Sequence, residues 1–319
     1  MSYSNYPNGF TTGLTIRGLP INVTNPGQVF FVNSTTVLAD GGVGGSNGNP
    51  GTYQKPFATI AYAVTRCKAN RGDVVMVMPG HTESVIAAAT ISVANGGVSI
   101  IGLGTGNKRP TITLSTAATA SIAVSGANVT FKNIIFSANF ADITKVFTVT
   151  AKYFLIEDCR IQATAADMNF LSIVSTNTTN NIADGMAMID SEWVEPDLLT
   201  ESMFNINGHI DGLTVNNNYA NLGVNTNNLP IVVKGATGKN LTNLVCEENM
   251  FQRFNTASPL LVVTDTGLSS TGTIHHNMIS HRDVAGELLV TTTTGIGFFE
   301  NKATAVADLS GYLLPAADA

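Results

Sequence analysis

Two short segments of this chain carry residue types that could bind a metal or exchange protons. Residues 246–251 read CEENMF and residues 274–279 read IHHNMI, so two glutamates in the first segment correspond to two histidines in the second. Imidazole and carboxylate groups are frequent zinc ligands and frequent general acids and bases. The first candidates for a ligand site or a catalytic centre are therefore Glu247, Glu248, His275 and His276.

Both segments are copies of a longer repeat, which indicates the elements that position them. Six-residue blocks align as FKNIIF (131–136), IEDCRI (156–161), MIDSEW (188–193), VNNNYA (215–220), CEENMF (246–251), IHHNMI (274–279) and FFENKA (298–303). Positions one and six are apolar or small in every block, as expected for side chains that face a core. Repeats of about 20 to 50 residues are typical of stacked architectures. The pattern predicts an all-β fold, a parallel β-solenoid in which the strands of each coil pair with those of its neighbours.

Position four of the block becomes asparagine in the last four copies. These residues are Asn218, Asn249, Asn277 and Asn301. Asparagine tolerates left-handed backbone angles at tight turns, and stacked side-chain amides can pass hydrogen bonds from coil to coil. We therefore predict a structural asparagine ladder, with the asparagine itself as the left-handed turn residue.

The repeat gives an ordinary explanation for the glutamates and histidines. Positions two and three flank the turn on the outside, so Glu247 is expected over His275 and Glu248 over His276 as surface pairs. A metal needs three or four converging ligands and a second shell of hydrogen bonds. The neighbouring coils offer few ligands at these positions: Asn216, Asn217, Phe299 and Glu300. We keep the four residues as weak ligand candidates and expect neither a metal nor another cofactor.

The rest of the chain divides into three parts. Residues 1–36 are predicted to form an extended N-terminal arm that ends in a strand, 37–303 the solenoid, and 304–319 a short tail. The solenoid includes one helix over about 57–70, where Thr59 is a candidate N-cap. An amphipathic helix here would cover the apolar end and the unpaired strand edges of the first coil.

Composition excludes several classes of function. The net charge of −6 and the lack of any Lys/Arg-rich run argue against a nucleic-acid partner. No stretch approaches the roughly 18 apolar residues of a membrane span, and the first residues lack the features of a secretion signal. We expect synthesis in a cytoplasm and no membrane partner. Three cysteines, an odd and small number, do not indicate a disulfide framework.

Several segments resemble a known group of proteins. GTYQKPFATIAYAV (51–64), RGDVVMVMPGHTESV (71–85) and VSIIGLG (98–104) resemble the N-terminal signature of right-handed parallel β-helix proteins of the pectate-lyase-like superfamily. The start, YPNGFTTGLTIRGLPI (6–21), is similar to sequences encoded among virion genes of tailed bacteriophages. The resemblance implies a right-handed β-helix and a virion structural protein, of the capsid decoration (cement) or tailspike-like type.

The outward residues suggest how such a protein would assemble. Position five places Tyr219, Met250 and Met278 on three consecutive coils, and contiguous exposed apolar strips usually mark association surfaces. We expect a non-enzymatic capsid decoration protein on the virion surface, assembled as a homotrimer and bound to the major capsid protein. The alternative for the strip is that a lateral loop of the same chain covers it.

An alternative hypothesis is that the same solenoid is an enzyme or an adhesin. Glycoside hydrolysis needs two carboxylates at a set separation, and lyase chemistry needs a base and usually a cation held by carboxylates. The candidate carboxylates are Asp158, Asp190, Glu192, Glu248 and Glu300, with Asp211 and Asp265 in loops. The chain lacks the paired aspartates and the Gly-His-Gly motif of galacturonases, and its single Trp193 occupies an inward position. A polysaccharide depolymerase or lyase, or a carbohydrate-binding adhesin, is thus the alternative.

Overall fold

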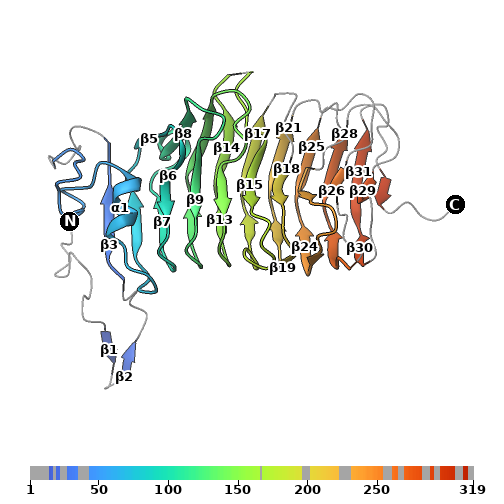
Figure 1. Ribbon diagram of the computed structural model, residues 1–319, viewed down its shortest axis with the longest axis horizontal. Helices are drawn as coiled ribbons and strands as arrows, with labels where there is room; N and C mark the ends of the chain where they lie inside the picture. The colour runs from blue at the N-terminus through green and yellow to red at the C-terminus, as the bar shows by residue number, and fades with distance from the viewer. Residues whose placement is uncertain are drawn as a thin grey trace.

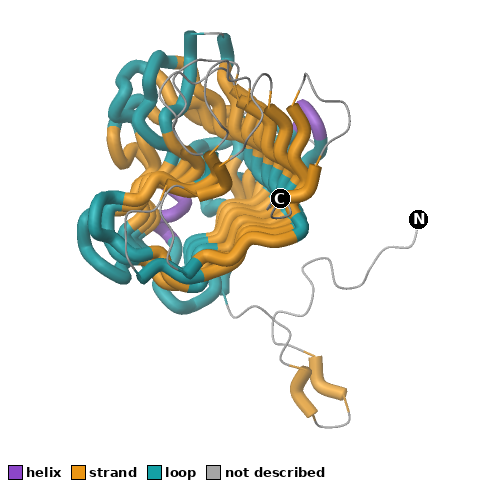
Figure 2. The backbone as a smooth tube through the Cα atoms, turned by 90° about the vertical axis from the view of Figure 1, so that its right-hand side faces the viewer, coloured by secondary structure: helices purple, strands orange, loops and turns teal. Residues whose placement is uncertain are grey.

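The protein is a parallel β-solenoid of three strand columns (Figure 1). The computed structural model describes residues 14–16, 19–21, 27–34, 43–165, 167–195, 202–222, 231–253, 261–264, 269–281, 288–290, 295–305 and 312–314. Figure 2 turns the molecule by 90° and shows the strands of successive coils lying one behind another, with the connecting loops at the corners. The prediction of an all-β parallel solenoid with one short helix is confirmed.

Each column is one sheet whose strands come from consecutive coils. The first sheet is 10-stranded and parallel: β3 (Val29–Val32), β4 (Val74–Val77), β7 (Ser99–Gly102), β10 (Thr130–Lys132), β13 (Leu155–Glu157), β16 (Ala187–Ile189), β20 (Thr214–Asn216), β24 (Leu244–Glu247), β27 (Gly272–His275) and β30 (Ile296–Phe299).

The second sheet begins one turn later in each coil. Its parallel strands are β5 (Thr82–Val85), β8 (Thr111–Ser115), β11 (Ile135–Asn139), β14 (Arg160–Ala163), β17 (Glu192–Glu195), β21 (Tyr219–Leu222), β25 (Met250–Arg253), β28 (Met278–His281) and β31 (Asn301–Ala305). An antiparallel strand, β32 (Tyr312–Leu314), pairs with β31 at the end of the stack.

The third sheet is 8-stranded and parallel. It contains β6 (Ala88–Val93), β9 (Ser121–Val124), β12 (Phe147–Val149), β15 (Ser172–Thr176), β18 (Ser202–Ile206), β22 (Val233–Gly235), β26 (Leu261–Thr264) and β29 (Leu288–Val290). A short parallel pair, β19 (Ile210–Asp211) and β23 (Leu241–Thr242), lies outside the three columns. A 3-10 helix occupies Gly106–Lys108.

The register of the stack is the one that the repeated blocks predict. Position-one residues pair in the first sheet from Phe131 to Phe298, and position-six residues pair in the second sheet from Phe136 to Ala303. Because side chains alternate across a strand, positions one and six both point inward. Trp193, at position six, is fully buried as expected.

One short helix, α1 (Ile60–Arg66), closes the N-terminal end of the solenoid by packing against β3, β4 and β6. Thr59 is the N-cap, since its side chain accepts the N–H of Tyr62 at 3.1 Å. Glu83 of β5 accepts the N–H groups of Ile60 at 2.6 Å and Ala61 at 3.2 Å, which ties the helix start to the first coil. These are the free donors of a helix N-terminus, and a carboxylate satisfies them well.

The helix ends earlier than the predicted limit of residue 70. Asp73 accepts the N–H of Lys68 at 2.7 Å, and Asn70 adopts a left-handed φ of 57°. Both features draw the chain out of the helix directly after Cys67, the C-cap residue. The predicted apolar face is present, because Ile60, Ala63, Val64 and Cys67 are all buried.

Residues near both ends join the sheets of the solenoid. Residues 1–36 were expected to form an extended arm that ends in a strand, and β3, near the end of this segment, pairs in parallel with β4 as the first strand of the first sheet. The apolar VFFV sequence of β3 favours a strand, and in the sheet Val32 is buried whereas Val29 stays exposed. Upstream, β1 (Leu14–Ile16) and β2 (Leu19–Ile21) form an antiparallel pair. In the tail, β32 extends the second sheet.

Candidate functional site

The turn between the first and second sheets carries or adjoins the predicted glutamates, histidines and asparagines. Position three of every block is the left-handed residue, with φ between 49° and 58°. The residues are Asn133, Asp158, Asp190, Asn217, Glu248, His276 and Glu300. The prediction that the position-four asparagines are left-handed is therefore wrong by one residue. The left-handed residue directs its side chain outward, whereas the next residue turns its side chain into the protein.

The position-four asparagines form a buried ladder. Asn218, Asn249, Asn277 and Asn301 are each at most 2% exposed. The side-chain Nδ2 of Asn218 donates to Oδ1 of Asn249 at 3.0 Å, and the next two steps measure 2.9 Å each. The amides are therefore continuous through four coils.

The ladder also satisfies every donor and acceptor of an interior amide. Asn249 shows the pattern: its Nδ2 donates to Asn277 Oδ1 and to the Val215 carbonyl, each at 2.9 Å. Its Oδ1 accepts the side-chain and backbone N–H groups of Asn218 at 3.0 and 2.9 Å. A primary amide has two donors and two lone pairs, so Asn249 is saturated. Removing one asparagine would leave buried polar groups without partners.

On the outer surface of this turn, glutamates and histidines of adjacent coils form pairs. Glu247 Oε2 lies 3.3 Å from His275 Nε2, as the register predicts. His276 pairs with Glu300 of the following coil instead of the expected Glu248. The His275 and His276 Nδ1 atoms are 2.8 Å apart, and the His275 ring stacks on Phe299 with centroids 4.8 Å apart.

These contacts form a surface ladder of carboxylate–imidazole contacts and stacked rings. In the part of the chain that the structure describes, no three His, Cys, Asp or Glu side chains converge as metal ligands. Glu247 also accepts a hydrogen bond from Asn216 at 2.9 Å. The chemistry available at this turn is thus charge pairing and hydrogen bonding along the stack.

The other candidate carboxylates are engaged in the same way. Glu192 lies 3.6 Å from Arg160, and Asp190 accepts a hydrogen bond from Asn217 at 2.7 Å. Asp158 lies 3.8 Å from Arg109. Hydrogen bonds from Thr242 and Asn243 lower the pKa of Asp211, which is the opposite of what a general acid requires. Asp265 lies outside the described residues.

The position-five residues form a strip beside this turn, which we call the Met strip: Tyr219, Met250 and Met278. They pair in register on β21, β25 and β28. Met250 is 43% exposed and Met278 is 45% exposed, while Tyr219 is partly buried.

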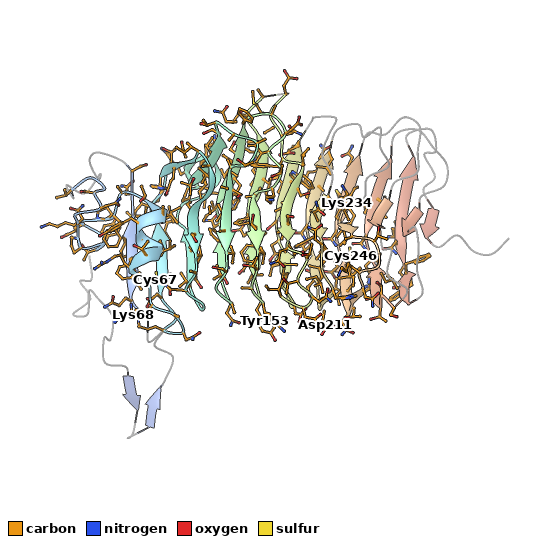
Figure 3. The ribbon with its side chains drawn as sticks, in the orientation of Figure 1. Cys67, Lys68, Tyr153, Asp211, Lys234 and Cys246 are labelled. Carbon is orange, nitrogen blue, oxygen red and sulfur yellow. The ribbon has the colours of Figure 1, made fainter. Side chains whose placement is uncertain are left out.

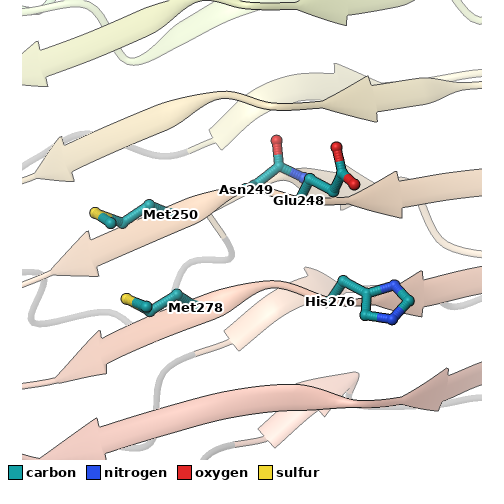
Figure 4. Close-up of a pocket in the computed structure, with 5 residues that line it drawn as sticks. All are labelled: Glu248, Asn249, Met250, His276 and Met278. Atoms are coloured by element: carbon teal, nitrogen blue, oxygen red, sulfur yellow. The ribbon is translucent and has the colours of Figure 1, made fainter.

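A shallow hollow of about 410 Å³ adjoins the two methionines. Its walls are Glu248, Asn249, Met250, His276 and Met278 (Figure 4). Both sulfurs point the same way along the outer face, away from the Glu248 carboxylate and the His276 ring. The structure thus brings Glu248 and His276 to one hollow without an ion pair between them.

Comparisons with known proteins show no family for this chain. No family model matches the sequence, and no curated protein matches it. A solved structure described as a rhamnogalacturonan lyase is similar over 86% of this chain and 87% of its own length, at 13% identity and a TM-score of 0.42. Such a likeness carries no argument about activity. In the residues described, no helix is both long and apolar enough to cross a membrane.

Proposed function

We propose that this chain is a non-enzymatic structural protein of a bacteriophage particle, a capsid decoration protein that assembles as a homotrimer through the Met strip. The observation that carries the proposal is the pair of exposed methionines in register on adjacent coils. A soluble protein gains by covering a contiguous apolar strip, and methionine adapts its shape to a partner surface. The similarity of residues 6–21 to virion sequences supports the phage context.

The electrostatic surroundings of the strip favour a copy of the same chain. Glu192 of β17 precedes Tyr219 in the position-five column, and Lys302 of β31 follows Met278. The apolar centre is therefore bordered by one negative and one positive residue, a composition like that of a polar interface rim. Three such faces around a three-fold axis would bury the strip in a closed assembly.

The strip would be the centre of the interface and not its whole extent. If about 150 Å² of apolar surface is covered per subunit, burial contributes roughly 4 kcal/mol before association entropy is subtracted. Stable interfaces bury about 800 Å² per partner, so polar surface around the hollow must also take part.

The proposal is tested by measuring the mass of the protein in solution. Light scattering at tens of micromolar is expected to give a trimer, and Met250→Glu is expected to give a monomer because it places a charge in the apolar centre. Ile86→Glu is the matched control, since Ile86 is 54% exposed and lies outside the strip. Wild-type protein that remains a monomer and does not rebind to capsids stripped of it would contradict the proposal.

A further inference from the structure

A second column of left-handed turns, which leads into the first sheet, contains one residue that does not fit it. The backbone N–H of each column residue donates to the coil above at 2.8 to 3.0 Å, from Asn70 to Gly212. All column residues have φ between 54° and 74°. They are Asn70, Gly97, Asn128, Tyr153, Gly185, Gly212 and Asn243. Glycine and asparagine are the residues this conformation favours, and a bulky aromatic residue there is an outlier.

The Tyr153 ring is not held in this conformation by a buried position. It is 56% exposed, the most exposed large apolar side chain of the described residues. Figure 3 shows Tyr153 at the edge of the solenoid, with Asp211 farther along the same edge. Strained residues of this kind persist where the surrounding structure enforces them, and they cluster at functional sites.

Glycines on the next two coils leave space for the ring and for a ligand beside it. A Cβ atom on Gly185 would lie 2.4 Å from Cδ1 of Tyr153, so the ring rests on this glycine. A Cβ atom on Gly212 would have only backbone atoms of Gly185 within 4 Å. Apart from its own chain neighbours, Gly212 thus has no side chain close to this position.

Fixed polar groups border this open surface. Asp184 Oδ2 pairs with Lys152 Nζ at 2.9 Å, and its Oδ1 accepts the N–H of Asp211 at 3.0 Å. Asp211 Oδ1 accepts hydrogen bonds from Thr242 and Asn243, each at 2.7 Å. The second oxygen of Asp211 has no partner among the described residues. These bonds lower the pKa of Asp211, which keeps its carboxylate charged and able to accept hydrogen bonds.

We propose that Tyr153 and the side of the solenoid beyond it, where Asp211 lies two coils away and Asn243 three, form a binding subsite for a glycan of neutral hexopyranose units. An exposed aromatic ring offers an apolar face to the C–H groups of a sugar, and amphipathic rings suit surfaces that are partly wet. The second carboxylate oxygen of Asp211 can accept a hydrogen bond from a sugar hydroxyl group, and the Asn243 amide can donate one. Two carboxylates against one ammonium leave the surroundings negative, which disfavours acidic sugars.

The experiment measures glycan binding and stability on the same variants. Saturation-transfer NMR with maltohexaose, cellohexaose, mannohexaose and hexagalacturonate is run on the wild-type protein, Tyr153→Asn and Tyr53→Ala. Tyr53 is the matched control, because it is 47% exposed and lies in another part of the chain. We expect one neutral hexasaccharide to bind saturably, with at least a tenfold loss of affinity in Tyr153→Asn and none in Tyr53→Ala. The melting temperature of Tyr153→Asn should equal or exceed that of the wild type, since asparagine suits the left-handed turn.

Three results would overturn the proposal. The first is that no neutral hexasaccharide binds at 10 mM, a concentration at which weak subsites are occupied. The second is binding that survives Tyr153→Asn, or that is stronger for hexagalacturonate. The third is a melting temperature that falls in Tyr153→Asn, which would make the ring a packing element. None of these results bears on the oligomeric state, so this proposal and the trimer fail separately.

Discussion

The turn between the first and second sheets is held differently in the two halves of the solenoid. In the N-terminal coils, position four is Ile134 or Cys159, both buried among apolar side chains. In the C-terminal coils it is asparagine, and the turn is held by saturated amide hydrogen bonds. Ser191 lies between the two regimes, since its Oγ accepts the N–H of Cys159 at 3.1 Å. One backbone turn can thus be stabilised either by apolar packing or by a directional ladder.

The core changes along with the turn. Four phenylalanines of the N-terminal half, Phe131, Phe136, Phe147 and Phe154, form a cluster with ring centroids 5.0 to 6.2 Å apart. The comparison indicates that the N-terminal coils depend on buried area and the C-terminal coils depend more on hydrogen-bond geometry. Substitutions in each half should therefore differ in size and in tolerance.

The largest effect is expected from the aromatic cluster. Phe147 is fully buried and contacts Phe136 and Phe154 with centroids 5.0 Å away in each case. Phe147→Ala should lower the free energy of unfolding by about 3–5 kcal/mol, because it removes buried area and leaves a cavity. Denaturant titration followed by Trp193 fluorescence measures it. The control Ile86→Ala, at a residue that is 54% exposed, should change the free energy by less than about 0.5 kcal/mol, and an equally small effect of Phe147→Ala would contradict the importance of the cluster.

The next effect concerns Asp73, at the N-terminal end. Burial opposes its ionisation, but hydrogen bonds from Arg71 and from the N–H groups of Lys68 and Gln28 outweigh burial and lower its pKa. Its stabilisation is therefore complete above the unfolded pKa of about 3.9 and is lost as pH falls through the lower folded pKa. Asp73→Asn should cost about 1.5–3 kcal/mol at pH 7. Melts from pH 7 to pH 2 should show the two proteins converging below about pH 4; a constant difference would refute the role of the charge.

A comparable or smaller effect is expected at the centre of the ladder. Asn249→Ala leaves the partners in the two adjacent coils unsatisfied and should cost about 1–3 kcal/mol. Asn249→Asp should cost at least as much, because it buries a charge. Asn249→Ser should be milder, since serine already occupies position four at Ser191. Thermal melts of all three variants that match the wild type would show that the ladder does not contribute.

The smallest effect is expected at Ser191, between the apolar turns of the N-terminal coils and the asparagine ladder of the C-terminal coils. Ser191→Asn would extend the ladder by one coil, with its Oδ1 replacing the serine hydroxyl that accepts from Cys159. One added net hydrogen bond is worth about 0.5–1.5 kcal/mol, and tighter packing subtracts from it. We expect the free energy of unfolding, measured by denaturant titration, to rise by less than about 1 kcal/mol. A loss of several kcal/mol would show that the N-terminal coils cannot accept the amide.

The sequence predicted the register of the stack but not every role within it. The alignment of inward positions such as Phe131 and Trp193 placed the strands correctly, because burial repeats with the coil. The left-handed residue was assigned to Asn249 in place of Glu248, since asparagine is the usual residue in that conformation and glutamate is not. Only the geometry shows that the amide is needed inside.

The site at Tyr153 was missed because the six-residue blocks begin too late to include it. Its column of turns lies three residues before position one, as with Asn128 before Phe131 and Tyr153 before Ile156, but the contacts that make it a site join different coils. Glu83 was missed for a related reason. Its position in a short strand gives no indication that its carboxylate accepts hydrogen bonds from the start of a helix 23 residues earlier in the sequence. Both depend on contacts between coils, which a single sequence does not display.

The difference between the two halves is tested most directly by the labelling of two buried thiols. Burial raises the pKa of Cys159 to about 12 and also raises that of Cys246, so iodoacetamide at pH 8 reacts only when a coil opens. Cys246 adjoins the ladder, with its Sγ 3.5 Å from Asn249 Nδ2. Peptide mass spectrometry gives the rate at each thiol. We expect Asn249→Ala to accelerate labelling of Cys246 about ten- to a hundredfold and to leave Cys159 unchanged; equal acceleration at both thiols, or none at either, would contradict the difference between the two halves.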